Sequence, residues 1–138
     1  MFLLDTHVVS ELRKARDGKA DRNVLRWANA QDASELFLSV ISLEEIERGV
    51  LLAERRDPRQ GAMLRTWLET HVIPAFADRL LSVDASVTRR SAAIQVPDRR
   101  PEADALIAAT ALVHGLKVAT RNVTDFAPTG VEVVNPWE

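Results

Sequence analysis

The chain has 138 residues, 46% of them apolar, and its 18 basic and 20 acidic residues leave a net charge of −2. This length suits one domain with a substantial core, covering residues 1–138. The absence of cysteine excludes a disulfide framework and a thiol nucleophile, so any metal site must use oxygen or imidazole ligands. The charge balance excludes a globally basic nucleic-acid-binding protein. No stretch approaches the roughly 20 apolar residues of a membrane span, so we expect a cytoplasmic protein without a membrane partner.

The first predicted strand ends in a carboxylate. Phe2, Leu3 and Leu4 form an apolar run, and Asp5 follows them directly before a segment with a helical pattern. In open α/β sheets, the edge formed by the carboxyl ends of the strands is where ligands bind. The alternative is that Asp5 only caps the following helix through a side-chain oxygen.

The middle of the chain predicts a strand between helices. A helical pattern covers residues 20–30, and an apolar strand follows over 36–41. Ser42 and Glu45 have capping-box spacing, which predicts a helix from about Leu43 to Arg55. We expect a further helix to begin at Asp57-Pro58 and to end before Pro74, which lacks a backbone N–H. Its apolar stripe predicts a core or dimer surface made of Met63, Leu64, Trp67 and Leu68.

The second half predicts three more strands, over residues 80–83, 117–120 and 131–134. Asp84 is expected to cap a helix after the first of them. A second helix, from Glu102 to Val113, is apolar nearly all round and should pack deep in the domain. Asp104 is the exception in it, because a carboxylate in a buried helix costs stability unless it is paired or coordinated.

The alternation of these elements predicts an α/β fold. Strands separated by helices favour a parallel sheet with right-handed crossovers. We therefore expect a five-stranded parallel sheet flanked by helices on both faces, which makes three layers.

Three acids share a position relative to the predicted strands. Asp5 and Glu45 follow the first two strands, and Asp104 opens the helix that leads into the fourth. Helix N-termini favour the charged form of a carboxylate, whereas mutual repulsion opposes it. A hard divalent cation such as Mg²⁺ or Mn²⁺ resolves this conflict, and it can activate water at a phosphoryl centre. The capping box explains Glu45 equally well.

Four spaced segments carry a further signal. They are Leu4-Asp5-Thr6-His7-Val8-Val9-Ser10-Glu11, Ile41-Ser42-Leu43-Glu44-Glu45-Ile46-Glu47-Arg48-Gly49, Ala103-Asp104-Ala105-Leu106-Ile107-Ala108-Ala109-Thr110-Ala111, and Val118-Ala119-Thr120-Arg121-Asn122 with Asp125-Phe126 and the ending Asn135-Pro136-Trp137. In this order they resemble the PIN-domain ribonucleases of the VapC toxin type, in the FitB-like branch. The resemblance spans essentially the whole chain.

The resemblance implies a PIN-like sheet of strand order 3-2-1-4-5 and a Mg²⁺- or Mn²⁺-dependent endoribonuclease toxin of a type II toxin–antitoxin system. It implies an RNA substrate, a small DNA-binding antitoxin of the VapB or FitA type as partner, and a homodimer. The family's metal-binding and catalytic acids fall on Asp5, Glu45 and Asp104. Asp5 and Asp104 would hold the metal, and Glu45 would orient a water or bind a second ion.

The fourth acidic position departs from the family pattern. This chain has Asn122 where many relatives have Asp, and Asp125 follows one helical turn later as a substitute. His7 replaces the Asn common at its position, and we assign it no catalytic role. The hydroxyl residues near the acids could hydrogen-bond carboxylates or phosphate, and Arg121 could contact phosphate or simply be solvated. Those hydroxyl residues are Thr6, Ser42 and Thr120.

Two rival hypotheses remain open from the sequence. A receiver-like phosphorelay domain would use Asp5, Asp84 and Thr120, although the chain lacks the second acid beside Asp5 and a Lys after the fifth strand. Alternatively, the chain is a catalytically silent PIN-fold partner that only binds an antitoxin, for which Asn122 is the motive.

Overall fold

A five-stranded parallel sheet forms the centre of the protein, in a computed structural model that describes residues 1–138. The order across the sheet is β3-β2-β1-β4-β5, which confirms the predicted fold and strand order. A receiver-like domain has the order 2-1-3-4-5, so that hypothesis was wrong. The strands are β1 (Phe2–Leu4), β2 (Leu36–Ser39), β3 (Leu80–Leu81), β4 (Lys117–Ala119) and β5 (Val133–Val134).

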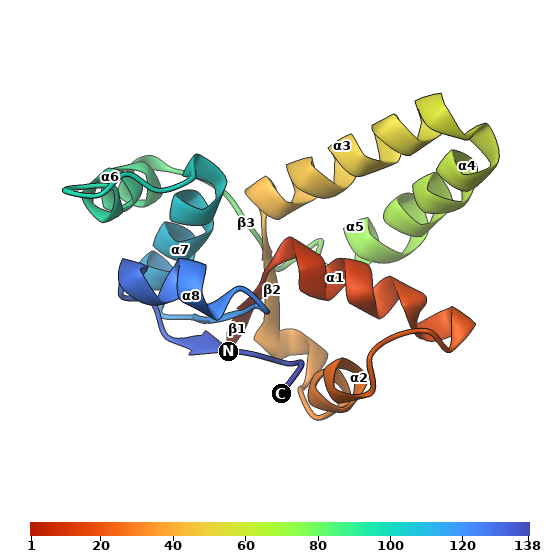
Figure 1. The fold of residues 1–138 in the computed structure, drawn as a ribbon, viewed down its shortest axis with the longest axis horizontal. Helices are drawn as coiled ribbons and strands as arrows, with labels where there is room; N and C mark the ends of the chain where they lie inside the picture. Colours follow the sequence, from red (N-terminus) through yellow and green to blue (C-terminus); the bar gives the residue numbers. More distant parts are fainter.

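Helices cover both faces of the sheet (Figure 1). One side carries α1 (Thr6–Arg13), α2 (Arg22–Asn29), α3 (Val40–Arg56), α4 (Pro58–Trp67) and the short α5 (Ile73–Ala75). The other side carries α6 (Ala85–Ile94), α7 (Glu102–His114) and α8 (Val123–Phe126). Short 3-10 turns lie at Lys14–Asp17, Ala33–Glu35 and Ala127–Thr129, and a π-helical turn at Leu68–Val72 joins α4 to α5. None of the helices combines the length and the apolar character needed to cross a bilayer.

The core is divided in two by the sheet, because successive residues of a strand point to opposite faces. Leu4 and Ala119 pack with α1, α3 and the π-helical turn, whereas Leu3 and Val118 pack with α7 and α8. All four side chains are at most 1% exposed. This alternation in two neighbouring strands is the physical basis of the three layers.

The predicted capping box at the start of α3 was wrong. The strand stops at Ser39, whose side-chain oxygen accepts a hydrogen bond of 3.0 Å from the backbone N–H of Ile41, so the helix starts at Val40. Ser42 is thereby buried inside the helix, and its hydroxyl has no hydrogen-bond partner. Glu45 is consequently free of the structural role that the capping box gave it.

The prediction that helical structure starting at Asp57-Pro58 ends before Pro74 was also wrong. The helical path continues through the π-helical turn, and Pro74 lies in the first turn of α5, which ends at Ala75. Proline is tolerated in a first helical turn, and a π turn changes the backbone hydrogen bonding immediately before it. In the apolar stripe of α4, Leu64, Trp67 and Leu68 pack on the core, while Met63 is 72% exposed.

Several other boundaries differ from the predictions by a few residues. β2, β3 and β4 end earlier than expected and β5 starts later, because residues count as strand only where a neighbouring strand pairs with them. The predicted caps at Asp57 and Asp84 are confirmed, with hydrogen bonds from Arg59 N (3.2 Å) and Val87 N (3.0 Å). Gly115 ends α7 in the left-handed region, at a φ of 69°.

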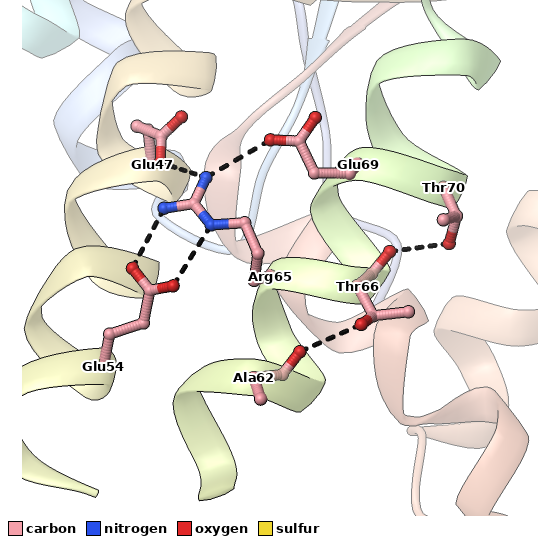
Figure 2. A network of polar contacts seen from close by, with 7 residues as sticks. All are labelled: Glu47, Glu54, Ala62, Arg65, Thr66, Glu69 and Thr70. Atoms are coloured by element: carbon pink, nitrogen blue, oxygen red, sulfur yellow. Dashed lines mark hydrogen bonds and ion pairs between the residues drawn. The ribbon is translucent and has the colours of Figure 1, made fainter. Parts of the chain in front are cut away.

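Helices α3 and α4 form a hairpin held by one guanidinium (Figure 2). Arg65 of α4 forms ion pairs with Glu47 (2.7 Å) and Glu54 (3.1 Å) of α3, and with Glu69 (3.3 Å) one turn further along its own helical path. The hydrogen bond from Arg65 lowers the pKa of Glu54. Gly61 permits the close approach of the two helices, since a Cβ there would lie 2.4 Å from Glu54 Cα.

Candidate active site

Asp5 lies at the carboxyl end of the central strand and is only 5% exposed. One carboxylate oxygen accepts a hydrogen bond from the backbone N–H of Thr6 at 2.8 Å, which caps α1. The other oxygen accepts a hydrogen bond from the hydroxyl of Thr120 at 2.7 Å, across the boundary between β1 and β4. The cap therefore occupies one oxygen, and the second fixes the carboxylate toward the strand-edge crevice. Each oxygen retains lone-pair capacity for a further ligand.

Glu45 is held beside Asp5 by the residue between them in the network. The hydroxyl of Thr6 donates a hydrogen bond of 2.6 Å to Glu45 Oε1, although 39 positions separate the two residues. This contact joins the first turn of α1 to α3. Thr6 thus donates its backbone N–H to the capping residue Asp5, and its hydroxyl orients Glu45.

Asp104 reaches the same region from α7, on the other side of the sheet. It is half-buried, and none of the hydrogen bonds or ion pairs of the structure satisfies its carboxylate. Burial raises the pKa of Asp104, and the negative charges of Asp5, Asp125 and Glu45 raise it further, while His7 acts in the opposite direction. The three predicted acids are therefore within electrostatic reach of one another, together with Asp125.

Asp125 adds a fourth negative charge to the acidic group, whereas Asn122 is neutral. The negative charge of Asp125 raises the pKa of Asp104 more than the negative charge of Glu45 does. Asn122 instead uses its backbone, donating to Thr120 Oγ1 (3.0 Å) and accepting from Asp125 N (3.1 Å) at the start of α8. These hydrogen bonds fix the start of α8, the helix that carries Asp125.

The acidic group contains no neutralising cation. None of the ion pairs of the protein involves Asp5, Glu45, Asp104 or Asp125. The side chains are also not closed into a preformed cage, because no set of three His, Asp or Glu residues lies close enough to hold an ion unaided. Oxygen ligands with room for water suit Mg²⁺ or Mn²⁺, since Mg²⁺ keeps several waters and uses only one or two carboxylates. The residues present therefore fit a hydrated divalent ion.

Of the other predicted side chains, two hydrogen-bond the acids and two do not. Thr6 and Thr120 hydrogen-bond carboxylates as expected, whereas Ser42 is buried without a partner. Arg121 lies with its guanidinium 5.2 Å from the centre of the Trp137 ring. The sequence assigned no role to Trp137, although its place in the ending Asn135-Pro136-Trp137 was the available signal.

Two cavities lie along α1, and their lining contains none of the four acids. One, of about 340 Å³, is mostly polar, and its lining is His7, Ser10, Glu11, Lys14, Arg121, Asn122 and Trp137. The other, of about 290 Å³, is mostly apolar and lies between α1 and the α4–α5 path, with Arg13, Arg16 and His71 among its lining residues. The sequence predicted neither cavity, because each is formed by residues far apart along the chain.

Comparison with known proteins gives the same fold and order of motifs. Residues 2–129 match the PIN domain family. The chain is 38% identical over 143 residues to "VapC ribonuclease Y4jK" of Sinorhizobium fredii, covering 100% of this chain and 99% of that protein. It is 34% identical over 142 residues to "Toxin FitB" of Neisseria gonorrhoeae, covering 99% of each. The solved structure of FitAcB from Neisseria gonorrhoeae superposes with a TM-score of 0.90 at 34% identity, covering 100% of this chain and 99% of that one.

Proposed function

The chain belongs to the PIN-domain family, and we propose that it is a divalent-metal-dependent endoribonuclease that acts as the toxin of a toxin–antitoxin pair. One observation carries the proposal: Asp104 at the start of α7 lies within electrostatic reach of Asp5, Asp125 and Glu45, and none of these four acids forms an ion pair. An uncompensated acidic group costs stability, and a bound metal ion offsets that cost. Relatives named as a ribonuclease and as a toxin support the activity.

We assign the metal to Asp5 and Asp104, with Glu45 placed to orient a water or to hold a second ion, and we favour Mg²⁺ or Mn²⁺. A divalent cation held there would acidify a water molecule and stabilise the negative charge that develops on the phosphodiester. Thr120 and Thr6 keep Asp5 and Glu45 in fixed orientations, at 2.7 and 2.6 Å, so the ligands are positioned before substrate arrives. Asp104 must be ionised to bind metal, and its raised pKa means that metal binding there competes with a proton up to a higher pH than at an ordinary aspartate.

The partner we propose is a small DNA-binding antitoxin of the VapB or FitA type. FitAcB, the solved structure that superposes on this chain, supports the choice. The apolar cavity beside α1 suits an apolar segment of such a partner, and Arg13 and Arg16 at the cavity would favour acidic residues on it. Self-association stays a prediction, as does a cytoplasmic location.

The test is cleavage of single-stranded RNA oligonucleotides by the purified chain without an antitoxin. We expect cleavage in Mg²⁺ or Mn²⁺ that is lost with a chelator and in Asp5→Asn. Asp84→Asn is the matched control, because Asp84 also caps a helix directly after a strand but lies outside the acidic group. Cleavage that resists both chelation and Asp5→Asn would contradict the proposal. Absence of cleavage with either metal would favour the catalytically silent, antitoxin-binding alternative.

A further inference from the structure

The polar cavity of about 340 Å³ is built on the same segments as part of the acidic group, because its lining residues His7 and Asn122 lie two positions from Asp5 and from Thr120, which hydrogen-bonds Asp5. His7 belongs to both, because it lines this cavity and its charge lowers the pKa of Asp104. The cavity differs from the acidic group in its charge, since Lys14 and Arg121 outnumber Glu11 in its lining. A negative region that suits a cation is therefore adjacent to a weakly positive one that suits a phosphate.

Trp137 forms a fixed wall of this cavity. Its ring packs partly buried against the core on the α1 side of the sheet. Its backbone carbonyl accepts a hydrogen bond from Asn23 Nδ2 at 2.7 Å, and its N–H donates to Asn135 Oδ1 at 3.0 Å. The indole is thus held in place by its packing, and the backbone of Trp137 by one hydrogen bond at its N–H and one at its carbonyl.

Arg121 lies over this ring and remains accessible to solvent. Its guanidinium carbon is 5.2 Å from the ring centre, a cation–π distance, and the residue is exposed. Arg121 and Trp137 both line the polar cavity, so the planar guanidinium is available to a ligand bound there. RNA-binding proteins stack unpaired bases on aromatic rings and on arginine planes of this kind.

The loop after β4 fixes the position of Arg121 relative to the acids. Thr120 donates its hydroxyl hydrogen to Asp5 and accepts from the backbone N–H of Asn122, so the residues on both sides of Arg121 are held by one hydroxyl. The metal-binding acid and the Arg121–Trp137 stack are consequently parts of one rigid unit. Such spacing is what a nuclease needs to place one nucleotide relative to the phosphate that it cleaves.

We propose that this cavity binds the nucleotide next to the scissile phosphate of single-stranded RNA, with its base stacked on the Arg121–Trp137 pair and its phosphate against Lys14. This inference rests on the proposed function, since it takes the acidic group as the place of cleavage. Lys14 is available for the role because its ammonium is held only by Glu11, at 3.3 Å, and its side chain is 44% exposed. Stacking is tolerant of base identity, so the subsite supplies affinity rather than strict sequence choice.

The experiment measures binding of a fluorescently labelled RNA pentamer by anisotropy, in chelator so that no cleavage occurs. We expect Arg121→Ala and Trp137→Ala to weaken binding about tenfold, the usual loss for one stacked base. Arg121→Lys should lose nearly as much, because it keeps the charge and removes the plane. Arg90→Ala removes an exposed arginine from α6 and should bind like the unchanged protein.

A second measurement covers the case in which Trp137→Ala does not fold. Trp137→Phe keeps an aromatic face, so we expect near-normal affinity. RNA binding should nevertheless quench less of the tryptophan fluorescence than in the unchanged chain, which has two further tryptophans. Equal affinities for Arg121→Ala, Arg121→Lys and the unchanged protein would overturn the inference, and so would unaltered quenching in Trp137→Phe.

The inference and the proposed function fail in different ways. If the acidic group is not a nuclease centre, the unchanged protein cleaves no RNA, whatever the binding data show. If only the subsite is wrong, the unchanged protein cleaves RNA, and Arg121→Ala cleaves it with the same KM. If both hold, Arg121→Ala raises the KM of cleavage by a factor similar to its loss of binding.

Discussion

Helix α3 contributes carboxylates to two acidic groups in which carboxyl pKa values shift in opposite directions. Glu45 belongs to the group with Asp5 and Asp104, which contains no cation, whereas Glu47 belongs to the group around Arg65 (Figure 2). The pKa of Asp104 is raised by burial and by neighbouring negative charge, while the pKa of Glu54 is lowered by its hydrogen bond with Arg65. We call an acidic group completed when an internal arginine balances its charge, and such a group stabilises the fold. An acidic group without such an arginine is incomplete, and we propose that an external cation balances its charge.

Substituting Asp104 tests the incomplete group with the largest expected effect. Asp104→Asn removes a proposed metal ligand and should lower cleavage more than ~100-fold, beyond the usual range for residues that only orient a ligand. Glu102→Gln is the control, because Glu102 lies in the same first turn of α7 but is exposed. Cleavage rates of the folded variants decide the matter, and a loss below tenfold in Asp104→Asn would remove this residue from the metal site.

The hydroxyl of Thr120 tests whether the acids must be oriented. Thr120→Val keeps the shape and removes the 2.7 Å hydrogen bond to Asp5, so we expect cleavage to fall ~10–100-fold. Thr110→Val is the control: that buried hydroxyl also has a single acceptor, Leu106 O in its own helix, and no contact with the acids. Comparable activity of the two variants would show that Asp5 needs no hydrogen-bond partner in the loop after β4.

Gly61 tests how closely the completed group must be packed. Gly61→Ala should lower the free energy of unfolding by ~1–3 kcal/mol, since the new Cβ would overlap the backbone of Glu54 at 2.4 Å. Gly49→Ala in α3 has no atom within 4 Å and should raise stability by ~0.5–1 kcal/mol, the usual gain for this change inside a helix. Urea denaturation measures both, and equal signs would contradict the role of close packing.

Removing the arginine converts the completed group into an incomplete one. Arg65→Met leaves Glu47, Glu54 and Glu69 without their shared cation, so thermal stability should fall, by less than for Gly61→Ala, while cleavage by the folded protein is unchanged. Arg48→Met is the control, because its one ion pair, with Glu44, joins side chains that are 61% and 69% exposed. A parallel loss of cleavage in Arg65→Met would mean that the two groups are coupled through α3.

The pH dependence of stability gives the smallest effect and a sign. Because the folded pKa of Asp104 is raised above 3.8, the folded state holds this proton to a higher pH than the unfolded state does. The metal-free chain therefore loses stability as pH rises through this interval. Asp104→Asn should be the more stable protein at pH 7, and the difference should vanish below the ordinary pKa of 3.8. Denaturation in chelator across pH checks this, and a less stable Asp104→Asn at pH 7 would refute it.

The sequence was sufficient for the sheet, and it also indicated that three acids lie near the carboxyl edge of the sheet, because both depend on local patterns. An apolar run that ends in Asp5 and an apolar helix that starts around Asp104 place carboxylates at one edge once the strands are parallel. Ser42 misled for the same reason: its capping-box spacing is a local pattern, and the end of β2 at Ser39 is decided by pairing with β3.

The remaining features depend on contacts between distant segments. Arg65 could not be assigned to Glu47 and Glu54 without knowing that Gly61 allows α3 and α4 to approach. The stack of Arg121 on Trp137 likewise depends on where the last residues cross α1 and α2. The choice between Asn122 and Asp125 was left open by the sequence, and the backbone hydrogen bonds of the turn after β4, which depend on Thr120, could not be predicted from it.

The hydrogen bond between Thr120 and Asp5 also has a consequence for synthesis. It joins residues 115 positions apart, so the central strand leaves the ribosome long before the strand that completes its carboxylate. Asp104 and Asp125 are likewise translated late, and domains emerge from their N-terminal side first. A growing chain therefore carries Asp5 and Glu45 without the rest of the acidic group. We expect the nascent protein to be harmless to the messenger and ribosome that are producing it until translation is nearly finished.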